Sequence, residues 1–371
     1  MTLAAPSQQL TAAGRPLCHR PYARLAARRR NGPRLASVAS RFSPTTVAAA
    51  AAAASSSSGP LSLFSPSKIN LFLRITARRP DGFHELASIF HVIDLGENMT
   101  FEELPEGGAG SAAKDELLCD AEGVPTDATN LAVKALDLFR SKMPAGSPAA
   151  TRFFRVTLEK NVPHGAGLGG GSANAATALW AANEVAGRPA SAAQLAAWGG
   201  EIGSDISVFF SKGAAYCTGR GELVEDVKPP LPLGTPMLLV KPPAGLSTPA
   251  VFRALDLGSR SAADPLRLSA GLRNLGRGSR ELCVNDLEPP AFLLMPELEE
   301  VKERLAKERG VDASFMTGSG STVVALGNGR ESSKSLSPPS WFLEEEKYKD
   351  WFWSPARLIA RAEGEWYRGP E

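Results

Sequence analysis

The sequence predicts a mixed α and β protein built in two lobes. Its 371 residues suffice for two ordinary domains, and 43% apolar with 22% charged residues is a common globular composition. Segments that alternate every second position, typical of strands, occur beside segments with helical spacing. A proline-rich stretch at residues 228–232 marks the predicted boundary between the lobes.

Residues 1–58 predict a disordered transit peptide ahead of the enzyme. They contain eight arginines and end in runs of alanine and serine. They contain no acidic residue, because the first acidic residue in the chain is Asp81. This composition is typical of organellar targeting and cannot build a core. The serine and alanine content favours the chloroplast, and a tail without a targeting role is the alternative.

Residues 59–371 are expected to be acidic and soluble. Without the eight arginines of residues 1–58, the net charge of +2 becomes −6 for residues 59–371. We therefore expect no nucleic-acid partner. No apolar run approaches the roughly 20 residues that cross a bilayer, so we expect no membrane partner. The four cysteines are far apart without a CxxC pair, which predicts free thiols in a reducing compartment.

Strands and helices can be assigned in order along the chain. Residues 68–75 alternate isoleucine or leucine with other residues, which predicts a half-buried strand. Further strands are predicted at residues 61–64, 153–160, 237–241 and 322–326. Residues 84–101 are expected to form one or two more strands, with a break at Gly96. Helices are predicted at residues 130–142, 172–185, 191–198, 248–255 and 296–309, the last ended by Gly310, with a short one at 358–366.

Residues 163–172, with the sequence PHGAGLGGGS, form a glycine-rich loop directly before an alanine-rich helix. Six of the last eight residues are glycine or alanine, so backbone N–H groups can turn inward without obstruction. The N-terminus of the following helix adds partial positive charge. The loop is therefore expected to hold phosphate groups, and a flexible connection is the alternative.

Other nucleotide-binding motifs do not fit this loop. A GxGxxG pattern at Gly165, Gly167 and Gly170 lacks both a strand directly before it and a later strand that ends in an acid. No Gly-Lys dipeptide exists for a P-loop, and the DFG of protein kinases is absent. A dinucleotide fold, a P-loop and a protein kinase are therefore not expected.

Two charged residues stand where the chain enters the interior. Asp205 precedes an apolar run and suits a base or electrostatic partner for a hydroxyl nucleophile, with a helix N-cap as the alternative. Lys68 opens a buried-looking strand and could offset phosphate charge, with a surface lysine as the alternative. Phe83 and His84 at a turn suit stacking and hydrogen bonding to a base.

Several segments occur in the order of the motifs of the GHMP kinase superfamily, which the chain resembles over about residues 63–327. They are SPSKINLFL at 65–73, the glycine loop, Gly203-Ser204-Asp205, and a second glycine turn, TGSGS at 317–321, which could face the substrate or be a tight bend. Within the superfamily, Lys68-Ile69-Asn70 with Asp81-Gly82-Phe83-His84 resembles the plastid members that serve non-mevalonate isoprenoid synthesis. The substrate of those members carries cytidine diphosphate.

The resemblance implies an α+β, two-lobed GHMP kinase fold. A ribosomal protein S5 domain 2-like N-terminal lobe would occupy residues 59–228 and a ferredoxin-like C-terminal lobe residues 229–329, followed by a linker and plant-type extension at 330–371. It also implies phosphoryl transfer from ATP, with Mg²⁺ as charge screen, to a small substrate with a cytidine diphosphate moiety. We expect a monomer or weak homodimer.

The resemblance also implies roles for single residues. Asp205 would be the catalytic carboxylate, as base or as electrostatic stabiliser, and Lys68 its cationic partner. Substrate contacts are implied for Asn70, Phe83, His84, Thr248 and Phe252, with the cytosine between the two phenylalanines. ATP contacts are implied for Asn130, Lys160, Pro163, Gly165, Ala166, Gly167, Leu168, Gly169, Gly170, Gly171 and Ser172. The third glycine motif comprises Thr317, Gly318, Ser319 and Gly320.

The chain departs from the family pattern at three places. Phe83 stands where bacterial members usually carry tyrosine, which keeps the stacking face and removes a hydroxyl. Ala166 and Ala173 replace the commoner glycine and serine, so Ser172 is the only hydroxyl of the loop and the metal ligands stay unknown.

The alternatives to this predicted function are a GHMP kinase for homoserine, mevalonate or a sugar, an inactive nucleotide-binding member, and an NAD-dependent dehydrogenase.

Overall fold

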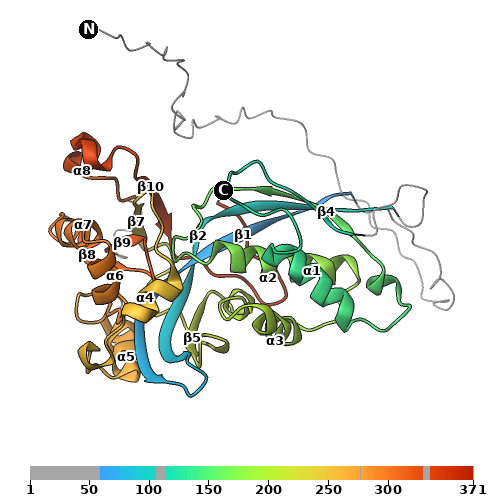
Figure 1. Ribbon diagram of the computed structural model, residues 1–371, viewed down its shortest axis with the longest axis horizontal. Helices are drawn as coiled ribbons and strands as arrows, with labels where there is room; N and C mark the ends of the chain where they lie inside the picture. The colour runs from blue at the N-terminus through green and yellow to red at the C-terminus, as the bar shows by residue number, and fades with distance from the viewer. Residues whose placement is uncertain (1–58, 106–113, 276, 329–334, 371) are drawn as a thin grey trace, which may run out of the picture. The chain divides into compact units, whose positions relative to one another are not determined.

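The structure is a computed structural model that describes residues 59–105, 114–275, 277–328 and 335–370. The predicted transit peptide lies outside these residues. The described part contains two sheets with helices packed on them (Figure 1). None of its helices has the length and apolar character needed to cross a membrane. The predicted α+β organisation is confirmed.

The N-terminal lobe is built on a six-stranded sheet in the order β3-β4-β2-β5-β6, with β1 paired to β2. Its strands are β1 (Leu61–Arg78), β2 (His84–Glu103), β3 (Glu116–Leu118), β4 (Phe154–Glu159), β5 (Ala214–Thr218) and β6 (Leu223–Asp226). The long β1–β2 hairpin also reaches the C-terminal lobe, because the Leu73 N–H donates to the Val284 carbonyl at 2.7 Å. It therefore forms one wall for elements of both lobes.

The strand predictions at this hairpin were partly wrong. The separate strands expected at residues 61–64 and 68–75 are one strand, β1, with only a register shift between Pro66 and Ser67. Gly96 lies inside β2 and does not end it. A Cβ atom at Gly96 would lie 2.4 Å from the Ser65 carbonyl oxygen, so glycine is needed there for close strand approach and not for a turn.

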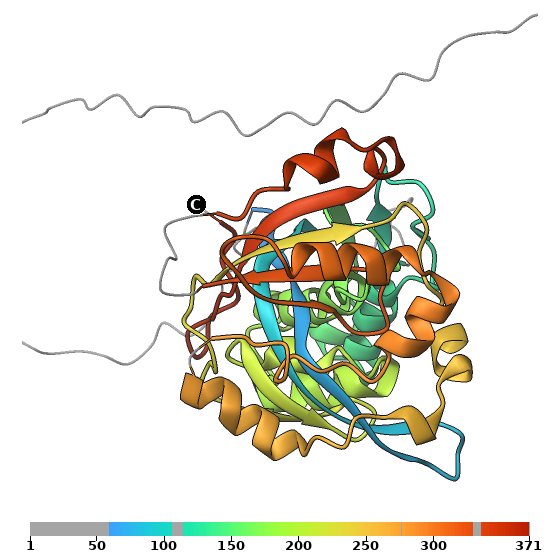
Figure 2. The same cartoon turned by 90° about the vertical axis from the view of Figure 1, so that its left-hand side faces the viewer.

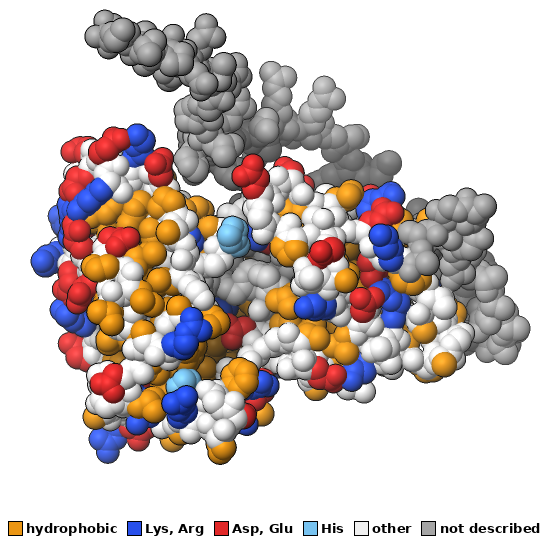
Figure 3. All heavy atoms as spheres, in the orientation of Figure 1, with side chains coloured by type: hydrophobic (Ala, Val, Ile, Leu, Met, Phe, Trp, Pro, Cys, Tyr) orange, Lys and Arg blue, Asp and Glu red, His pale blue; other side chains and the backbone are white. Residues whose placement is uncertain are grey.

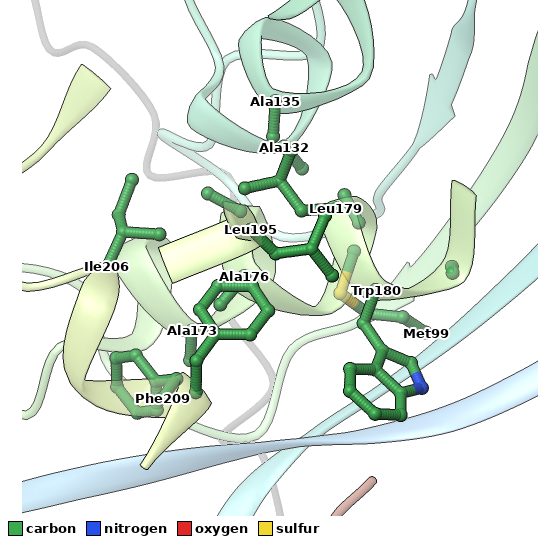
Figure 4. Packing of buried hydrophobic residues seen from close by; sticks show 14 of the residues in the cluster. Met99, Ala132, Ala135, Ala173, Ala176, Leu179, Trp180, Leu195, Ile206 and Phe209 are labelled. Atoms are coloured by element: carbon green, nitrogen blue, oxygen red, sulfur yellow. The ribbon is translucent and has the colours of Figure 1, made fainter. Parts of the chain in front are cut away.

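Three helices pack beside this sheet: α1 (Leu131–Lys142), α2 (Gly170–Val185) and α3 (Ala192–Ile202). The alanine-rich α2 is buried along nearly its whole length, with Ala173, Ala176 and Leu179 fully enclosed. Figure 4 shows α2 side chains beside Ala132 and Ala135 of α1 and Leu195 of α3. Small side chains let the helices approach closely, which fixes the position of the glycine loop at the start of α2.

The C-terminal lobe contains a four-stranded antiparallel sheet in the order β10-β7-β9-β8 (Figure 2). Its strands are β7 (Pro236–Lys241), β8 (Val311–Met316), β9 (Val323–Gly327) and β10 (Phe352–Arg357). Its helices are α4 (Thr248–Ala254), α5 (Pro265–Leu275), α6 (Glu288–Leu294), α7 (Glu297–Leu305) and α8 (Ser340–Glu344). Short 3₁₀ turns occur in both lobes. They are η1 (Pro148–Ala150) and η2 (Ser207–Phe210) in the N-terminal lobe, and η3 (Leu257–Ser259) and η5 (Glu346–Tyr348) in the C-terminal part of the chain.

The C-terminal extension is part of both lobes. Its strand β10 pairs with β7 in the C-terminal sheet. Beyond β10 the chain crosses to the N-terminal lobe, where the Trp366 indole lies 5.1 Å from that of Trp180 and donates to the Phe64 carbonyl at 2.9 Å. The helix predicted at residues 358–366 does not form, because this segment follows the N-terminal lobe as an extended strap.

Candidate active site

Lys68 and Asp205 meet at the centre of the molecule although 137 positions separate them. Lys68 lies in β1, Asp205 lies in the turn between α3 and η2, and the ammonium nitrogen is 3.3 Å from a carboxylate oxygen. The Lys68 side chain is 3% exposed and that of Asp205 is 35% exposed. Lys68 is therefore no surface lysine. No side chain caps η2, so Asp205 is not its N-cap either.

Asn70 fixes the Lys68 ammonium. Its Oδ1 accepts from Lys68 Nζ at 2.9 Å, and its Nδ2 donates to Ser88 Oγ at 2.8 Å. Its backbone N–H donates to Thr317 Oγ1 at 2.9 Å. Both ends of the Asn70 amide thus contact the protein, although the residue also lines the cavity beside Asp205. Its contact with a substrate remains a prediction.

The glycine loop turns back on itself before α2 begins. Gly165, Gly167 and Gly169 all have positive φ angles of 64°, 73° and 71°, which glycine adopts without strain. Gly169 is the N-cap of α2 and supplies no side chain to its first N–H groups. The start of this 16-residue helix therefore keeps backbone donors and a positive dipole end for an anion.

The second glycine turn holds the glycine loop in place. A Cβ atom at Gly167 would lie 2.5 Å from the Thr317 carbonyl oxygen, so the two backbones are in direct contact. The Thr322 N–H also donates to the Ala166 carbonyl at 3.3 Å. Asn285 Nδ2 donates to one carbonyl directly before the second turn and to one within it. These are the carbonyls of Met316, at 2.7 Å, and Gly318, at 2.8 Å.

Two cavities meet at the glycine loop. The larger one, about 790 Å³, is lined from both lobes by residues that include Lys68, Asp205 and Phe252, and we call it the acceptor cavity. The smaller one, about 370 Å³, lies along the glycine loop and we call it the nucleotide cavity. Their shared wall consists of Gly167, Gly169 and Ser172. Figure 3 shows a hollow between the lobes with charged side chains of both signs at its border.

Every residue with a predicted ATP contact lines the nucleotide cavity. Lys160 forms an ion pair with Glu97, a buried carboxylate 1% exposed that lies next to Gly170. Asn130 is the N-cap of α1, since its Oδ1 accepts from the Ala132 N–H at 2.9 Å. The two side chains are thus held by the fold at the cavity wall, and their contacts with ATP remain predictions.

The far end of the acceptor cavity is aromatic. The His84 and Phe252 rings are stacked with centroids 5.2 Å apart, while Phe83 is 57% exposed. The structure thus brings His84, and not Phe83, against Phe252. Partial burial, and then the nearby Arg78 guanidinium, lower the pKa of His84 below its usual value. A neutral imidazole there can hydrogen-bond an uncharged base.

The second glycine turn faces the acceptor cavity and is not only a tight bend. Gly318 and Ser319 line this cavity. The Ser319 hydroxyl lies 2.8 Å from the Thr248 hydroxyl, which ties the start of α4 to the turn. The turn therefore borders the acceptor cavity, and its contact with a substrate remains a prediction.

Sequence reasoning missed four residues that shape the site. Ser88 and Asn285 orient other site residues, Glu97 pairs with Lys160, and Arg220 lines the acceptor cavity. Only Arg220 carries a local signal, a Gly-Arg-Gly turn between two short strands. The partners of the other three are distant in the chain, so no sequence pattern indicates them.

Comparison with known families defines the class of protein. The chain matches the model of the GHMP kinases N terminal domain at residues 130–213 and that of the GHMP kinases C terminal domain at residues 267–337. These matches cover three parts of the site described above, namely the glycine loop, Asp205 and the second glycine turn. The chain is a GHMP kinase.

Closer relatives define the family within that class. The chain is 53% identical over 312 residues to the chloroplastic 4-diphosphocytidyl-2-C-methyl-D-erythritol kinase of Oryza sativa subsp. japonica, covering 84% of this chain and 73% of that one. The corresponding Arabidopsis thaliana kinase is 50% identical, with 84% and 77% covered. The chain belongs to the family of 4-diphosphocytidyl-2-C-methyl-D-erythritol kinases.

Solved structures agree with this membership. A crystal structure of 4-(cytidine 5'-diphospho)-2C-methyl-D-erythritol kinase superposes with a TM-score of 0.59 at 30% identity, covering 73% of this chain and 92% of that one. A homoserine kinase from Cytophaga hutchinsonii superposes with a TM-score of 0.60 at 16% identity, which shows the common fold alone. The plant relatives are named chloroplastic, and the chloroplast localisation predicted from the leader is confirmed.

Proposed function

We propose that this enzyme transfers the terminal phosphoryl group of ATP to the 2-hydroxyl of 4-diphosphocytidyl-2-C-methyl-D-erythritol. The products are the 2-phosphate and ADP, a step of the non-mevalonate route to isopentenyl diphosphate. One observation supports this above all. The Lys68–Asp205 pair stands at the acceptor side of the wall that the acceptor cavity shares with the nucleotide cavity. A hydroxyl beside that pair faces phosphates held on the other side of the wall.

The chain contributes positioning and charge to this reaction. Backbone N–H groups of the glycine loop and of the first turn of α2 hold the phosphates, and Lys68 offsets the charge of the transferring group. Asp205 accepts the hydrogen bond of the attacking hydroxyl and takes up its proton as the new P–O bond forms. The bond between the terminal phosphorus and the bridging oxygen breaks, and that oxygen leaves with ADP. A carboxylate in this role supplies about 10²-fold to 10⁴-fold in rate.

The aromatic end of the acceptor cavity receives the cytosine. Phe83 and Phe252 offer ring faces for stacking, and neutral His84 offers a ring nitrogen for hydrogen bonding. The His84–Phe252 stack must open for a base to enter between aromatic faces. Thr248, on the same wall, is placed to contact the methylerythritol part.

Mg²⁺ enters the site with ATP. This ion binds oxygen ligands, keeps several waters and needs only one or two protein groups beside the phosphates. Among the described residues no group of three or more acidic, histidine or cysteine side chains is arranged to hold a metal ion. Ser172 lines both cavities, and its hydroxyl could hold the ion. The ion would supply charge neutralisation to the phosphates.

A coupled assay of ADP release tests this function. We expect the enzyme to phosphorylate the cytidyl substrate in preference to homoserine, mevalonate and galactose, because these lack a base for the aromatic end. Asp205→Ala should lose turnover while ATP affinity is kept. Asp350→Ala is the control, because Asp350 is exposed and lies outside both cavities. Preference for one of the rival alcohols would refute the substrate, and a near-normal rate in Asp205→Ala would remove that residue from the mechanism.

A further inference from the structure

The turn between β5 and β6 is built to present one arginine. Gly219 and Gly221 have positive φ angles of 70° and 118°, which a residue with a side chain rarely adopts. A Cβ atom at Gly219 would also lie 2.9 Å from a carboxylate oxygen of Glu222. That carboxylate accepts from the Arg220 backbone N–H at 2.6 Å, which closes the turn. Arg220 therefore projects from a rigid support.

This turn touches both functional ends of the acceptor cavity. Toward the base end, the Arg220 guanidinium carbon lies 5.4 Å from the centre of the Phe83 ring, and the Gly219 carbonyl accepts from the Leu86 N–H at 2.7 Å. Toward the reacting end, a Cβ atom at Gly221 would lie 3.4 Å from a carboxylate oxygen of Asp205. Arg220 thus stands between the place for the cytosine and the place for the attacking hydroxyl.

The charges of the cavity favour an anion at this point. Three arginines, Arg78, Arg220 and Arg253, line it together with Lys68, whereas Asp205 is its only lining carboxylate. Of the three arginines, Arg220 lies near the Phe83 ring and belongs to the turn whose Gly221 approaches Asp205. Its nearest acidic partner is Glu222, with Nε and Oε1 3.5 Å apart. Within the described residues its guanidinium donates no hydrogen bond to the protein at ordinary distance, so its donors remain available.

We propose that Arg220 binds the diphosphate that joins the cytidine to the methylerythritol, and so selects nucleotide-linked alcohols over free ones. The inference rests on the proposed function, because that substrate has its diphosphate between the base and the reacting hydroxyl. A guanidinium presents paired N–H donors that match phosphate oxygens and keeps its charge at any physiological pH. Stacking on Phe83 orients the guanidinium and links base binding to diphosphate binding.

The test compares CDP with cytidine as calorimetric probes, with excess ADP present to fill the nucleotide cavity. Arg220→Gln should weaken CDP binding about 10-fold to 100-fold, as expected for loss of hydrogen bonds to a charged group. Cytidine binding should change little. In turnover, KM for the cytidyl substrate should rise by a similar factor, with kcat and KM for ATP nearly unchanged. Arg220→Lys, which keeps the charge and loses the fork, should fall between.

The control is Arg280→Gln, which removes an exposed arginine that pairs with Glu303 at 2.9 Å outside the acceptor cavity. Unfolding temperatures check that the variants are folded. CDP binding within twofold of the unchanged enzyme in Arg220→Gln would overturn the inference, and so would an equal loss for cytidine, which would mean that Arg220 acts only through Phe83. Failure of the unchanged enzyme to phosphorylate the cytidyl substrate would instead refute the proposed function.

Discussion

Replacing Gly167 by alanine should separate the glycine loop from the second glycine turn. The new Cβ atom would lie 2.5 Å from the Thr317 carbonyl oxygen, whereas ordinary contact begins at 3.4 Å, so one backbone must move by about 0.9 Å. The positive φ of 73° adds about 1–2 kcal/mol of strain. A displacement of about 1 Å in groups that position a reaction can reduce the rate about 100-fold.

Two matched glycines separate strain from displacement. Gly146 has φ of 77° with nothing within 4 Å of a Cβ and lies outside both cavities. Gly310 has φ of 88° with nothing within 4 Å and lies outside both cavities. Alanine at either position should lower the free energy of unfolding by about 1–2 kcal/mol and leave the rate near normal.

The assays are chemical denaturation and steady-state kinetics of ADP release. We expect kcat/KM for ATP to fall about 100-fold in Gly167→Ala and to stay within a few-fold of normal in the two controls. If Gly167→Ala loses stability like the controls but keeps its rate, contact between the two glycine turns does not position the phosphates. If alanine at Gly146 or Gly310 costs as much activity as Gly167→Ala, conformational strain alone explains the effect.

Three further predictions concern stability. Burial lowers the pKa of His91 from its ordinary 6.5 to about 4. The free energy of unfolding should therefore be undiminished by His91 above pH 6.5 and should fall by about 3 kcal/mol as the pH drops to 4, because the unfolded state binds the proton more readily. His91→Gln should flatten this measured pH profile. Glu97→Gln should lower the free energy of unfolding by about 3 kcal/mol in urea titrations, because it leaves the Lys160 ammonium largely buried without its carboxylate. Tyr367→Phe, which removes a 2.9 Å bond to the Ser211 carbonyl, should lower it by about 1 kcal/mol, and an unchanged midpoint would contradict that bond.

Local patterns in the sequence predicted much of the site because its chemistry lies in short segments. The glycine loop is followed at once by α2, and Asp205 enters the interior directly before η2, so both could be located from neighbouring residues. Lys68 opens an alternating segment that does form a strand. What the sequence could not give is the 3.3 Å distance between Lys68 and Asp205, which depends on the packing of β1 against the helices.

The features that were missed depend on distant partners. Strand β10 contains Pro355, which counts against a strand, and it forms because the edge of β7 supplies its hydrogen bonds. Asn285 has no motif around it, and its role appears only when β8 and β9 bring the second glycine turn within 2.8 Å. Residues 358–366 have helical spacing, but contacts of Trp366 with the N-terminal lobe outweigh that preference.

The strap at the end of the chain has a consequence for how the enzyme is made. Trp366 closes over the edge of β1 at Phe64, so a residue 302 positions further along the chain completes a lobe that begins near residue 61. Translation delivers the N-terminal residues first, and import led by an N-terminal transit peptide does the same. The catalytic lobe therefore reaches its final packing only after Trp366 has followed the N-terminal residues into the organelle.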